Sequence, residues 1–415
     1  MQSKEVYLLN QLLRNRVFVI VATADLLQQA GIWIRNMALL FYIMNQTNND
    51  PTAVSLLTAL EYLPIFVFSL LGGTFADRWN PKKTVILGDT LSAISMLVIL
   101  ALVSLGLWQA VFAATVVSAI VSQFSQPSSS VLFRKHVPAE QVGAAIGITQ
   151  SLMSVFTIFG PIAGTFIYTQ LGLKFSLIIL FVIFLMAAFI QLFLPPSSRE
   201  ETVKKRPAME DLKDGIQYVI KHSNLRLIAG MFLLTGGAIG LTQPLDVFVT
   251  MERLGLPKEA VQWFAACEGV GMLVGGILAA TISKWVDRHR NNVITSTLIL
   301  WSIITIIEVL SIFPLLTAGV RIISGITTAF FQVVFNTLMI KEVQVEYIGR
   351  TNGVITPLLM GGILVGTLVS GFIVNSLTLF GVYGLSAVLI ILCTILTAKL
   401  KVYNEGDNTR EAGIK

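Results

Sequence analysis

Hydrophobic stretches of about 20 residues follow one another along the whole chain, and short polar segments that carry most of the charge separate them. An apolar helix of that length crosses the roughly 30 Å hydrocarbon core of a bilayer. The pattern therefore predicts an all-α membrane protein with twelve transmembrane helices. The expected spans are residues 17–45, 52–77, 83–105, 108–133, 142–169, 173–194, 225–250, 259–284, 292–314, 316–340, 351–375 and 380–400.

A long polar connection separates the first six spans from the last six. It opens with Pro195 and Pro196, and it continues into a short amphipathic helix in which Leu212, Ile216 and Val219 share one face. We expect an N-terminal six-helix bundle at 1–194 and a C-terminal six-helix bundle at 225–400. Residues 195–224 then form a cytosolic linker, and residues 401–415 form a cytosolic tail.

The two halves resemble each other in sequence at an offset of 206 residues, the separation of Val137 from Val343. Six further identities follow at that offset: Glu140, Gly143, Gly147, Gly160, Phe166 and Ile167 recur as Glu346, Gly349, Gly353, Gly366, Phe372 and Ile373. Such a duplication of six-helix halves is typical of secondary transporters, whose substrate site lies between the repeats near the middle of the membrane. We therefore expect the two bundles to be pseudo-symmetric.

Composition and charge agree with this picture. The chain is 54% hydrophobic and only 13% charged, against about 25% charged residues in soluble domains. Most of its 29 Lys and Arg residues fall in the segments that face the cytosol if both termini lie there, as the positive-inside rule requires. We expect a multi-pass protein of the plasma membrane with both termini in the cytosol. The net charge of +6 then reports topology and not a nucleic-acid partner.

The sequence contains no G-x-x-x-x-G-K-[ST] phosphate loop and no H-E-x-x-H metal pair. Its three histidines lie in the expected cytosolic segments, and Cys267 and Cys393 both fall within spans. We therefore expect no cofactor, no metal site and no enzymatic activity. The proton gradient is the expected energy source, and carboxylates must then carry the protons.

Ionisable side chains inside a membrane span are costly and are functional candidates by default. The candidates for proton coupling or substrate binding are Asp25, Arg35, Glu61, Asp246 and Glu268. Glu61 and Glu268 nearly superpose in the internal repeat, so we expect two acids facing one central cavity. The alternative is that a neighbouring Arg or Ser hydroxyl satisfies each acid. Arg35 can pair with an acid such as Glu61, which we favour, or it can hold an anionic group of a substrate.

Other polar and aromatic positions inside the spans are candidates for lining a cavity. On the first span, polar residues follow a helical stripe, and the fourth span is unusually polar for a bilayer segment. In the fourth span, bonds of the polar side chains within their own helix are the alternative. The cavity-lining candidates are Gln28, Gln29, Asn36, Gln126, Phe331, Gln332 and Asn336.

The loop between the second and third spans carries a motif. Gly73, Asp77, Arg78 and Lys82 match G-x-x-x-D-R-x-G-R-[KR], while Asn80 and Pro81 depart from it. This pattern resembles the signature of the major facilitator superfamily. The resemblance implies a gate on the cytosolic side, held closed by charges of this loop.

The fifth span carries a second motif. The spacing of its small residues resembles the antiporter signature of drug-exporting members of this superfamily, with matches at Gly147, Gly160, Pro161 and Gly164. The resemblance implies that this element is part of a hinge between the fifth and eighth spans. Small residues there let helices approach closely, and the Pro bends the span. Taken over the whole chain, the sequence looks like the macrolide-efflux branch of the proton-coupled drug antiporters.

The family resemblance also implies which helices matter. In that family the third, sixth, ninth and twelfth spans support the cavity from behind, so Asp89 and Glu308 are expected to form structural pairs. We expect alternating-access export of hydrophobic or amphiphilic small molecules in exchange for protons, by a monomer in the lipid bilayer. The alternatives are an exporter or flippase of an endogenous product such as a siderophore or lysolipid, or, more remotely, a membrane scaffold or sensor that transports nothing.

Overall fold

In the part of the chain that the structure describes, all the regular secondary structure is helical. The computed structural model describes residue 12 and residues 14–76, 80–196 and 208–400. Nine helices in this part are long and apolar enough to cross a membrane. This agrees with the all-α fold expected from the sequence.

In the described residues of the N-terminal half, five helices follow one another. They are α2 (Arg16–Gln46), α3 (Pro51–Ala76), α4 (Pro81–Ser104), α5 (Ala110–His136) and α6 (Ala139–Gln191). Asn15 caps α2 by accepting hydrogen bonds from the backbone of Val17 and Phe18. Asn80 caps α4 in the same way, with Pro81 in the first turn.

The C-terminal half begins with the linker helix and contains the remaining elements. They are α7 (Ala208–Lys221), α8 (Ser223–Thr242), η1 (Gln243–Leu245), α9 (Asp246–Phe248), η2 (Val249–Arg253), η3 (Lys258–Ala260), α10 (Val261–Thr281), α11 (Ser283–Arg288), α12 (Arg290–Leu310), α13 (Pro314–Glu342), η4 (Val345–Tyr347) and α14 (Ile348–Thr397). The amphipathic helix expected in the linker is α7.

Two of the helices are each long enough for two crossings. α6 has 53 residues and α14 has 50, and each is broken by one residue in the left-handed region, Gly172 with φ 71° and Thr378 with φ 59°. At about 1.5 Å per residue, either helix is more than twice as long as a bilayer core is thick. Both breaks fall between spans separated in the sequence prediction. With the shorter apolar segment at the start of α5, these helices provide the twelve expected crossings.

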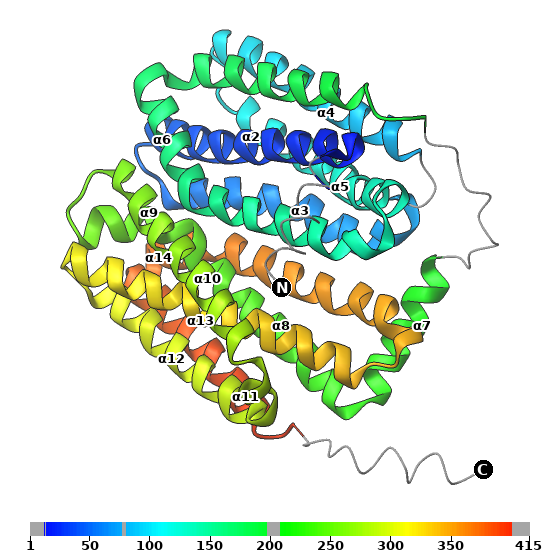
Figure 1. The fold of residues 1–415 in the computed structure, drawn as a ribbon. Coiled ribbons are helices and arrows are strands. Elements are labelled where there is room, and N and C mark those ends of the chain that lie inside the picture. The colour runs from blue at the N-terminus through cyan, green and yellow to red at the C-terminus, as the bar shows by residue number, and fades with distance from the viewer. Residues whose placement is uncertain (1–11, 13, 77–79, 197–207, 401–415) are drawn as a thin grey trace.

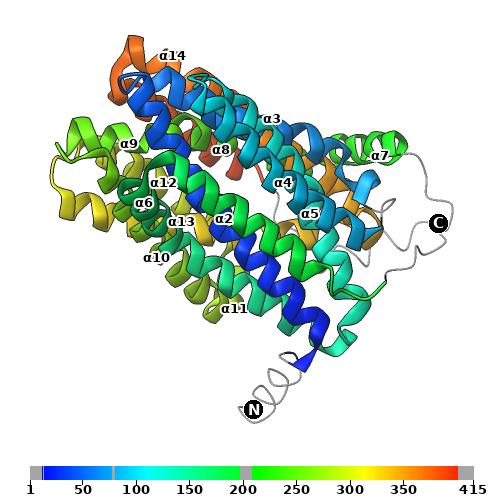
Figure 2. The same ribbon diagram turned by 90° about the horizontal axis from the view of Figure 1, so that it is seen from above.

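The two halves lie side by side, with α7 at one end of the molecule (Figure 1). The view from above shows the long helices running roughly alongside one another (Figure 2). The halves meet where α3 packs on α14 and where α6 packs on α10. We call the end that carries α7 the linker end and the opposite end the distal end.

Side-chain hydrogen bonds join the halves at the distal end. The hydroxyl groups of Ser55 and Ser370 lie 3.0 Å apart, and Thr52 donates to the carbonyl of Gly371 at 3.2 Å. Tyr62 donates to Gln243 at 3.1 Å. In the described part of the chain, the side-chain hydrogen bonds between the halves all lie toward this end. These hydrogen bonds therefore join the two halves at the distal end.

Glycines allow α8 and α14 to pack backbone against backbone. Gly236 and Gly240 on α8 face Gly362 and Gly366 on α14, in the i, i+4 spacing that brings membrane helices close together. A Cβ atom on Gly240 would lie 2.2 Å from the carbonyl oxygen of Ile363. Any side chain at this position must push the two backbones apart.

We predict that Gly240→Ala destabilises the protein, because the added methyl group collides with backbone and not with a flexible side chain. The expected cost is about 1–3 kcal/mol. The matched control is Gly276→Ala on α10, where an added Cβ meets nothing within 4 Å. Thermal unfolding of both purified variants in detergent should show a lowered midpoint for Gly240→Ala alone. An equal effect of the two substitutions would contradict this packing.

Candidate functional site

A cavity of about 530 Å³ lies between the two halves. The N-terminal half lines it with residues of α2, α3, α5 and α6, and the C-terminal half with residues from α8 to α14. Apolar and aromatic side chains form much of the wall, including Trp33, Leu40 and Trp301. Its polar residues include Arg35, Asn36, Glu61, Tyr62, Gln243, Asp246, Gln262, Glu268, Glu308, Arg321 and Tyr383.

On the N-terminal side, Arg35 is held by three side chains, those of Asn36, Glu61 and Ser118. Its Nη2 atom lies 2.7 Å from Glu61 Oε1, which is the ion pair favoured from the sequence. Nη1 donates to the hydroxyl of Ser118, while Nε and Nη2 both donate to Asn36 Oδ1. The Arg35 side chain is only 4% exposed, so these contacts replace the water that the guanidinium has lost.

On the C-terminal side, one guanidinium serves three carboxylates. Arg321 lies 2.7 Å from Asp246, 2.9 Å from Glu268 and 2.5 Å from Glu308. Tyr383 donates a hydrogen bond to Asp246 at 3.1 Å. The side chains of Arg321 and Glu308 are each 8% exposed, whereas Asp246 and Glu268 are about one quarter exposed on the cavity side. We call these four ionisable residues the Arg321 cluster.

The Arg321 cluster carries more negative than positive charge when all its groups are ionised. Arg321 compensates one of the three carboxylates and leaves two negative charges beside a partly apolar cavity. Uncompensated charge is costly in such a setting. The arrangement therefore favours binding of positive charge, either protons on the carboxylates or a cationic group of a bound molecule. Among the described residues, no group of three His, Cys, Asp or Glu side chains has the arrangement of a metal site.

The structure brings most of the ionisable candidates together. Arg35, Glu61, Asp246 and Glu268 line the cavity, and so does Asn36. Asp25 lies elsewhere, on α2 close enough to Asp89 for their charges to interact.

The glutamines expected on α2 do not line this cavity. Gln28 donates from Nε2 to both carboxylate oxygens of Asp89, at 2.8 and 2.9 Å. Gln29 is likewise not among the lining residues. The physical reason for Gln28 is the buried carboxylate on α4, which is 2% exposed and draws the amide between the helices of its own half. The side chain of Gln126 is outside the described residues.

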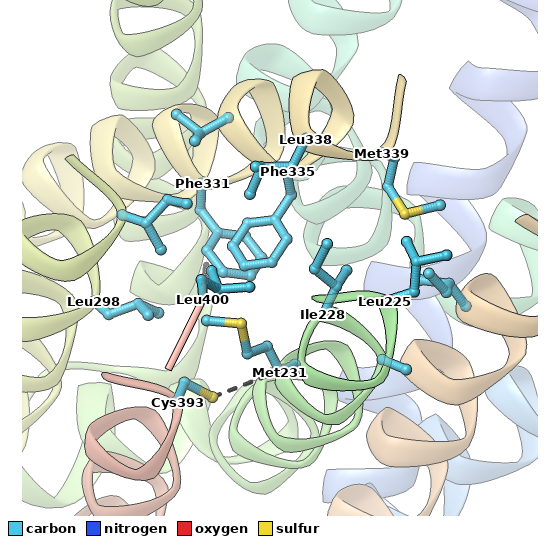
Figure 3. Packing of buried hydrophobic residues seen from close by; sticks show 14 of the residues in the cluster. Leu225, Ile228, Met231, Leu298, Phe331, Phe335, Leu338, Met339, Cys393 and Leu400 are labelled. Atoms are coloured by element: carbon cyan, nitrogen blue, oxygen red, sulfur yellow. Dashed lines mark hydrogen bonds between the residues drawn. The ribbon is translucent and has the colours of Figure 1, made fainter. Parts of the chain in front are cut away.

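Phe331 lies in the apolar core of the C-terminal half and not in the cavity wall. Its ring packs 4.2 Å from that of Phe335 and 5.6 Å from that of Trp301. Figure 3 shows Phe331 and Phe335 among Ile228, Met231 and Leu338. Packing against Phe335, one helical turn farther along α13, and against Trp301 on α12 accounts for the position of the Phe331 ring. Gln332 and Asn336 are exposed on α13 and do not line the cavity.

Part of the gate motif can be described. Gly73 lies in the last turns of α3, and Lys82 binds the carbonyl oxygens of Leu192 and Leu194 at the end of α6. Lys82 therefore joins the start of α4 to the carbonyls that directly follow α6 in the same half. Asp77 and Arg78 lie outside the described residues.

The antiporter-like glycines pack against α2. A Cβ on Gly160 would lie 2.4 Å from the Trp33 ring, and one on Gly164 would lie 2.7 Å from the Trp33 carbonyl. Pro161 lies between them inside α6, whereas a Cβ on Gly147 would meet nothing within 4 Å. The contact of α6 with α10 is made instead at Gly269, beside Thr157 and Ile158.

Sequence reasoning missed the central members of the C-terminal site. Glu308 does form the expected ion pair, but it also lines the cavity, although α12 was expected to lie behind it. Arg321 and Tyr383 were not among the candidates, and neither was Tyr62 on the N-terminal side of the cavity. The available signal was the charge of Arg321 inside an apolar span, because an intramembrane Arg needs acidic partners. The same half contains three acids in three other spans, and this argument identifies them as possible partners of Arg321.

We predict that Arg321→Met strongly destabilises the protein, because three carboxylates then share a buried site without a cation. Breaking a buried ion pair from one side costs about 3–5 kcal/mol. Adding Glu308→Gln to Arg321→Met should restore part of the loss, since it removes the most buried acid. Thermal unfolding in detergent measures both effects, with Lys174→Met at an exposed position as the control. A midpoint for Arg321→Met equal to that of the control would contradict the cluster.

Comparison with known proteins identifies the family to which this chain belongs. The family model described as Major Facilitator Superfamily matches residues 21–285 and 272–415. Two solved structures share the fold. The nucleoside transporter NupG gives a TM-score of 0.74 at 14% identity, covering 94% of this chain and 100% of NupG. A D-xylose-proton symporter gives 0.70 at 13% identity, covering 94% and 98%.

Sequence relatives are also transporters of this type. The uncharacterised MFS-type transporter YkuC of Bacillus subtilis (strain 168) is 29% identical over 290 residues, which cover 66% of this chain and 67% of YkuC. Macrolide efflux protein A of Streptococcus pyogenes is 24% identical over 378 residues, which cover 88% of this chain and 90% of that protein. The family model matches nearly the whole length of this chain. The chain therefore belongs to the major facilitator superfamily and is a multi-pass membrane transporter of small molecules.

Proposed function

We propose that this transporter exports hydrophobic or amphiphilic small molecules, neutral or cationic, in exchange for protons that enter the cell. It works as a monomer in the plasma membrane and uses no cofactor. The similarity to macrolide efflux protein A supports export of bulky amphiphiles as the direction and class of transport. The observation that carries the proposal is the Arg321 cluster at the wall of the cavity.

The cavity has the chemistry that such an exchange needs. Its aromatic and aliphatic wall suits the apolar body of a ligand, and a few polar groups can fix its orientation. The two uncompensated carboxylates of the Arg321 cluster attract positive charge. Protons and a cationic substrate therefore compete for the same negative charges, and this competition couples their movements in opposite directions.

An anionic endogenous product, such as a siderophore or a lysolipid, is less well supported. Its transport calls for a cationic side chain that is available to the ligand. Arg35 is occupied by Glu61, Asn36 and Ser118, and Arg321 faces three acids. Both arginines that line the cavity are thus already committed to partners inside the protein. This favours a neutral or cationic substrate.

We assign the linker end to the cytosol, because the basic segments of the sequence gather there. The distal end then faces outward, and the hydrogen bonds that join the halves there support a state closed to the outside. Transport requires the contacts of α3 with α14 and of α6 with α10 to open while the linker end closes.

We predict that Glu268→Gln abolishes transport driven by a pH gradient, because it removes a carboxylate that exchanges its proton for substrate. Glu61→Gln should do the same by freeing Arg35 inside the cavity. The measurement is uptake of a macrolide and of a panel of neutral, cationic and anionic amphiphiles into inverted membrane vesicles or proteoliposomes. Substrate counterflow without a pH gradient should survive in Glu268→Gln.

The control variant is Glu210→Gln, an exposed acid of α7, which should transport like the wild type. Normal gradient-driven uptake by both Glu268→Gln and Glu61→Gln would refute proton coupling through these acids. Selective uptake of the anionic members of the panel would instead support the endogenous-product alternative and reject the proposed substrate class.

We predict that a disulfide between Ser55→Cys and Ser370→Cys locks the distal end and stops transport. The two hydroxyl groups already lie 3.0 Å apart on α3 and α14. Mild oxidation should cross-link the double variant and abolish uptake, and a reductant should restore it, with each single variant as the control. Full transport by the quantitatively cross-linked protein would contradict opening at this contact.

A further inference from the structure

One hydrogen bond joins the two halves within the wall of the cavity itself. Tyr62 on α3 donates to Gln243 Oε1 at 3.1 Å, and both residues line the cavity. Among the described residues, the other side-chain hydrogen bonds between the halves are made by residues that do not line it, such as Asn45, Thr52 and Ser55. A ligand in the cavity therefore meets the bond between Tyr62 and Gln243 directly.

This bond is accessible from the cavity. The side chain of Gln243 is exposed and that of Tyr62 is half-buried. Removing the partner of a fully buried polar group costs about 1–3 kcal/mol. A bond that is open to the cavity avoids this cost, because a ligand that enters can replace each partner.

The backbone is irregular at the same place. α8 ends at Thr242, and the chain continues through the 3₁₀ turn η1, the three-residue helix α9 and the π-helix η2. Pro244 lies in this turn and has no N–H group with which to continue an α-helix. Transporters place such interruptions of a membrane helix where the backbone lines a substrate cavity. The backbone thus points to Gln243 independently of its hydrogen bond.

Negative charge lies next to both partners of this bond. Side chains three residues apart in a 3₁₀ turn lie on the same side, and Asp246 follows Gln243 at that spacing and also lines the cavity. Asp246 belongs to the Arg321 cluster, and Glu61 directly precedes Tyr62. A cationic group bound at the Arg321 cluster therefore brings the adjacent atoms of the same molecule to Tyr62 and Gln243.

The donors and acceptors of the two side chains decide which group fits there. The phenol has one proton to donate, and the amide oxygen can only accept. A ligand group that only accepts takes the proton of Tyr62 but leaves Gln243 Oε1 without a donor. A hydroxyl group accepts from Tyr62 and donates to Gln243, so one bond between the halves is replaced by two bonds to the ligand.

We propose that Tyr62 and Gln243 determine specificity by binding a hydroxyl group of the substrate, which also carries an ammonium group a few bonds away. The substrate class is then an amphiphilic amino alcohol, whose ammonium group binds at the Arg321 cluster. This inference rests on the proposed function, since it takes the cavity as the substrate site. It narrows the cationic substrates of that function to those with a neutral group that both donates and accepts.

The test compares three forms of one amphiphilic amine, which differ only at the hydroxyl group: propranolol, its analogue without the hydroxyl group, and its methyl ether. Binding to the purified full-length protein in detergent is measured by equilibrium dialysis at neutral pH without a gradient. Dialysis against detergent alone corrects for partition of the amines into micelles. We expect the wild type to bind propranolol about threefold to tenfold more tightly than either analogue, which corresponds to one additional hydrogen bond.

Two substitutions that conserve side-chain volume separate the two partners. In Gln243→Met the ether should gain on the deoxy analogue and bind as tightly as propranolol, because Tyr62 can donate to both oxygens. In the double variant Tyr62→Phe with Gln243→Met, the preference for propranolol over its deoxy analogue should disappear. The matched control is Tyr168→Phe, which removes the phenol of a residue that does not line the cavity and should keep the wild-type preference.

The wild-type comparison needs no variant and can overturn the proposal alone. Equal binding of propranolol and its deoxy analogue, together with their gradient-driven transport, would overturn this inference and leave the proposed function in place. A preference for propranolol that survives in the double variant would also overturn it, because another group would then bind the hydroxyl. Absence of binding of all three amines would reject the cationic substrate class of the proposed function, and this inference with it.

Discussion

The ion pairing of Arg321 with three carboxylates is the interaction on which the account of this transporter depends. The guanidinium joins α13 to η1–α9, α10 and α12 at one point, so it fixes four parts of the C-terminal half around the cavity. The single positive charge of Arg321 does not neutralise the three carboxylates that surround it. A group that both holds the half together and retains affinity for positive charge can respond to protonation by changing helix packing.

The two halves share an architecture but differ in their electrostatics. In the N-terminal half, the arginine at the cavity meets a single acid, and Asp89 is buried away from it against the amide of Gln28. In the C-terminal half, the acids gather at the cavity, and the position equivalent to Asp89 is a threonine bonded to another threonine. Duplication thus supplied the scaffold, while the ionisable groups diverged.

Sequence patterns were sufficient for the fold because hydropathy and span length act locally. The breaks at Gly172 and Thr378 fall where the apolar runs were divided, and the helices of the structure begin and end within a few residues of the expected spans. The pair of Arg35 with Glu61 was also predictable, because an unpaired arginine in a membrane is costly.

The remaining site could not be predicted, since a sequence gives the depth of a residue but not the rotation of its helix in the bundle. On α13, Arg321, Ser324 and Thr328 face the cavity, whereas Phe331 lies farther along, where the helix meets α8 and α12. Glu308 reaches the cavity from a helix that was expected to stand behind it. These outcomes depend on side-chain packing between segments far apart in the chain, which periodicity does not encode.

Exchange of protons for substrate at the Arg321 cluster can be measured without a membrane gradient. Purified protein in weakly buffered detergent solution, mixed with a cationic amphiphile that it transports, should release protons in proportion to the substrate bound. The account predicts that this release falls when Glu268→Gln and Asp246→Asn are introduced together, while Glu210→Gln leaves it unchanged. Tight substrate binding with no proton release from the wild type at any pH near neutrality would contradict it.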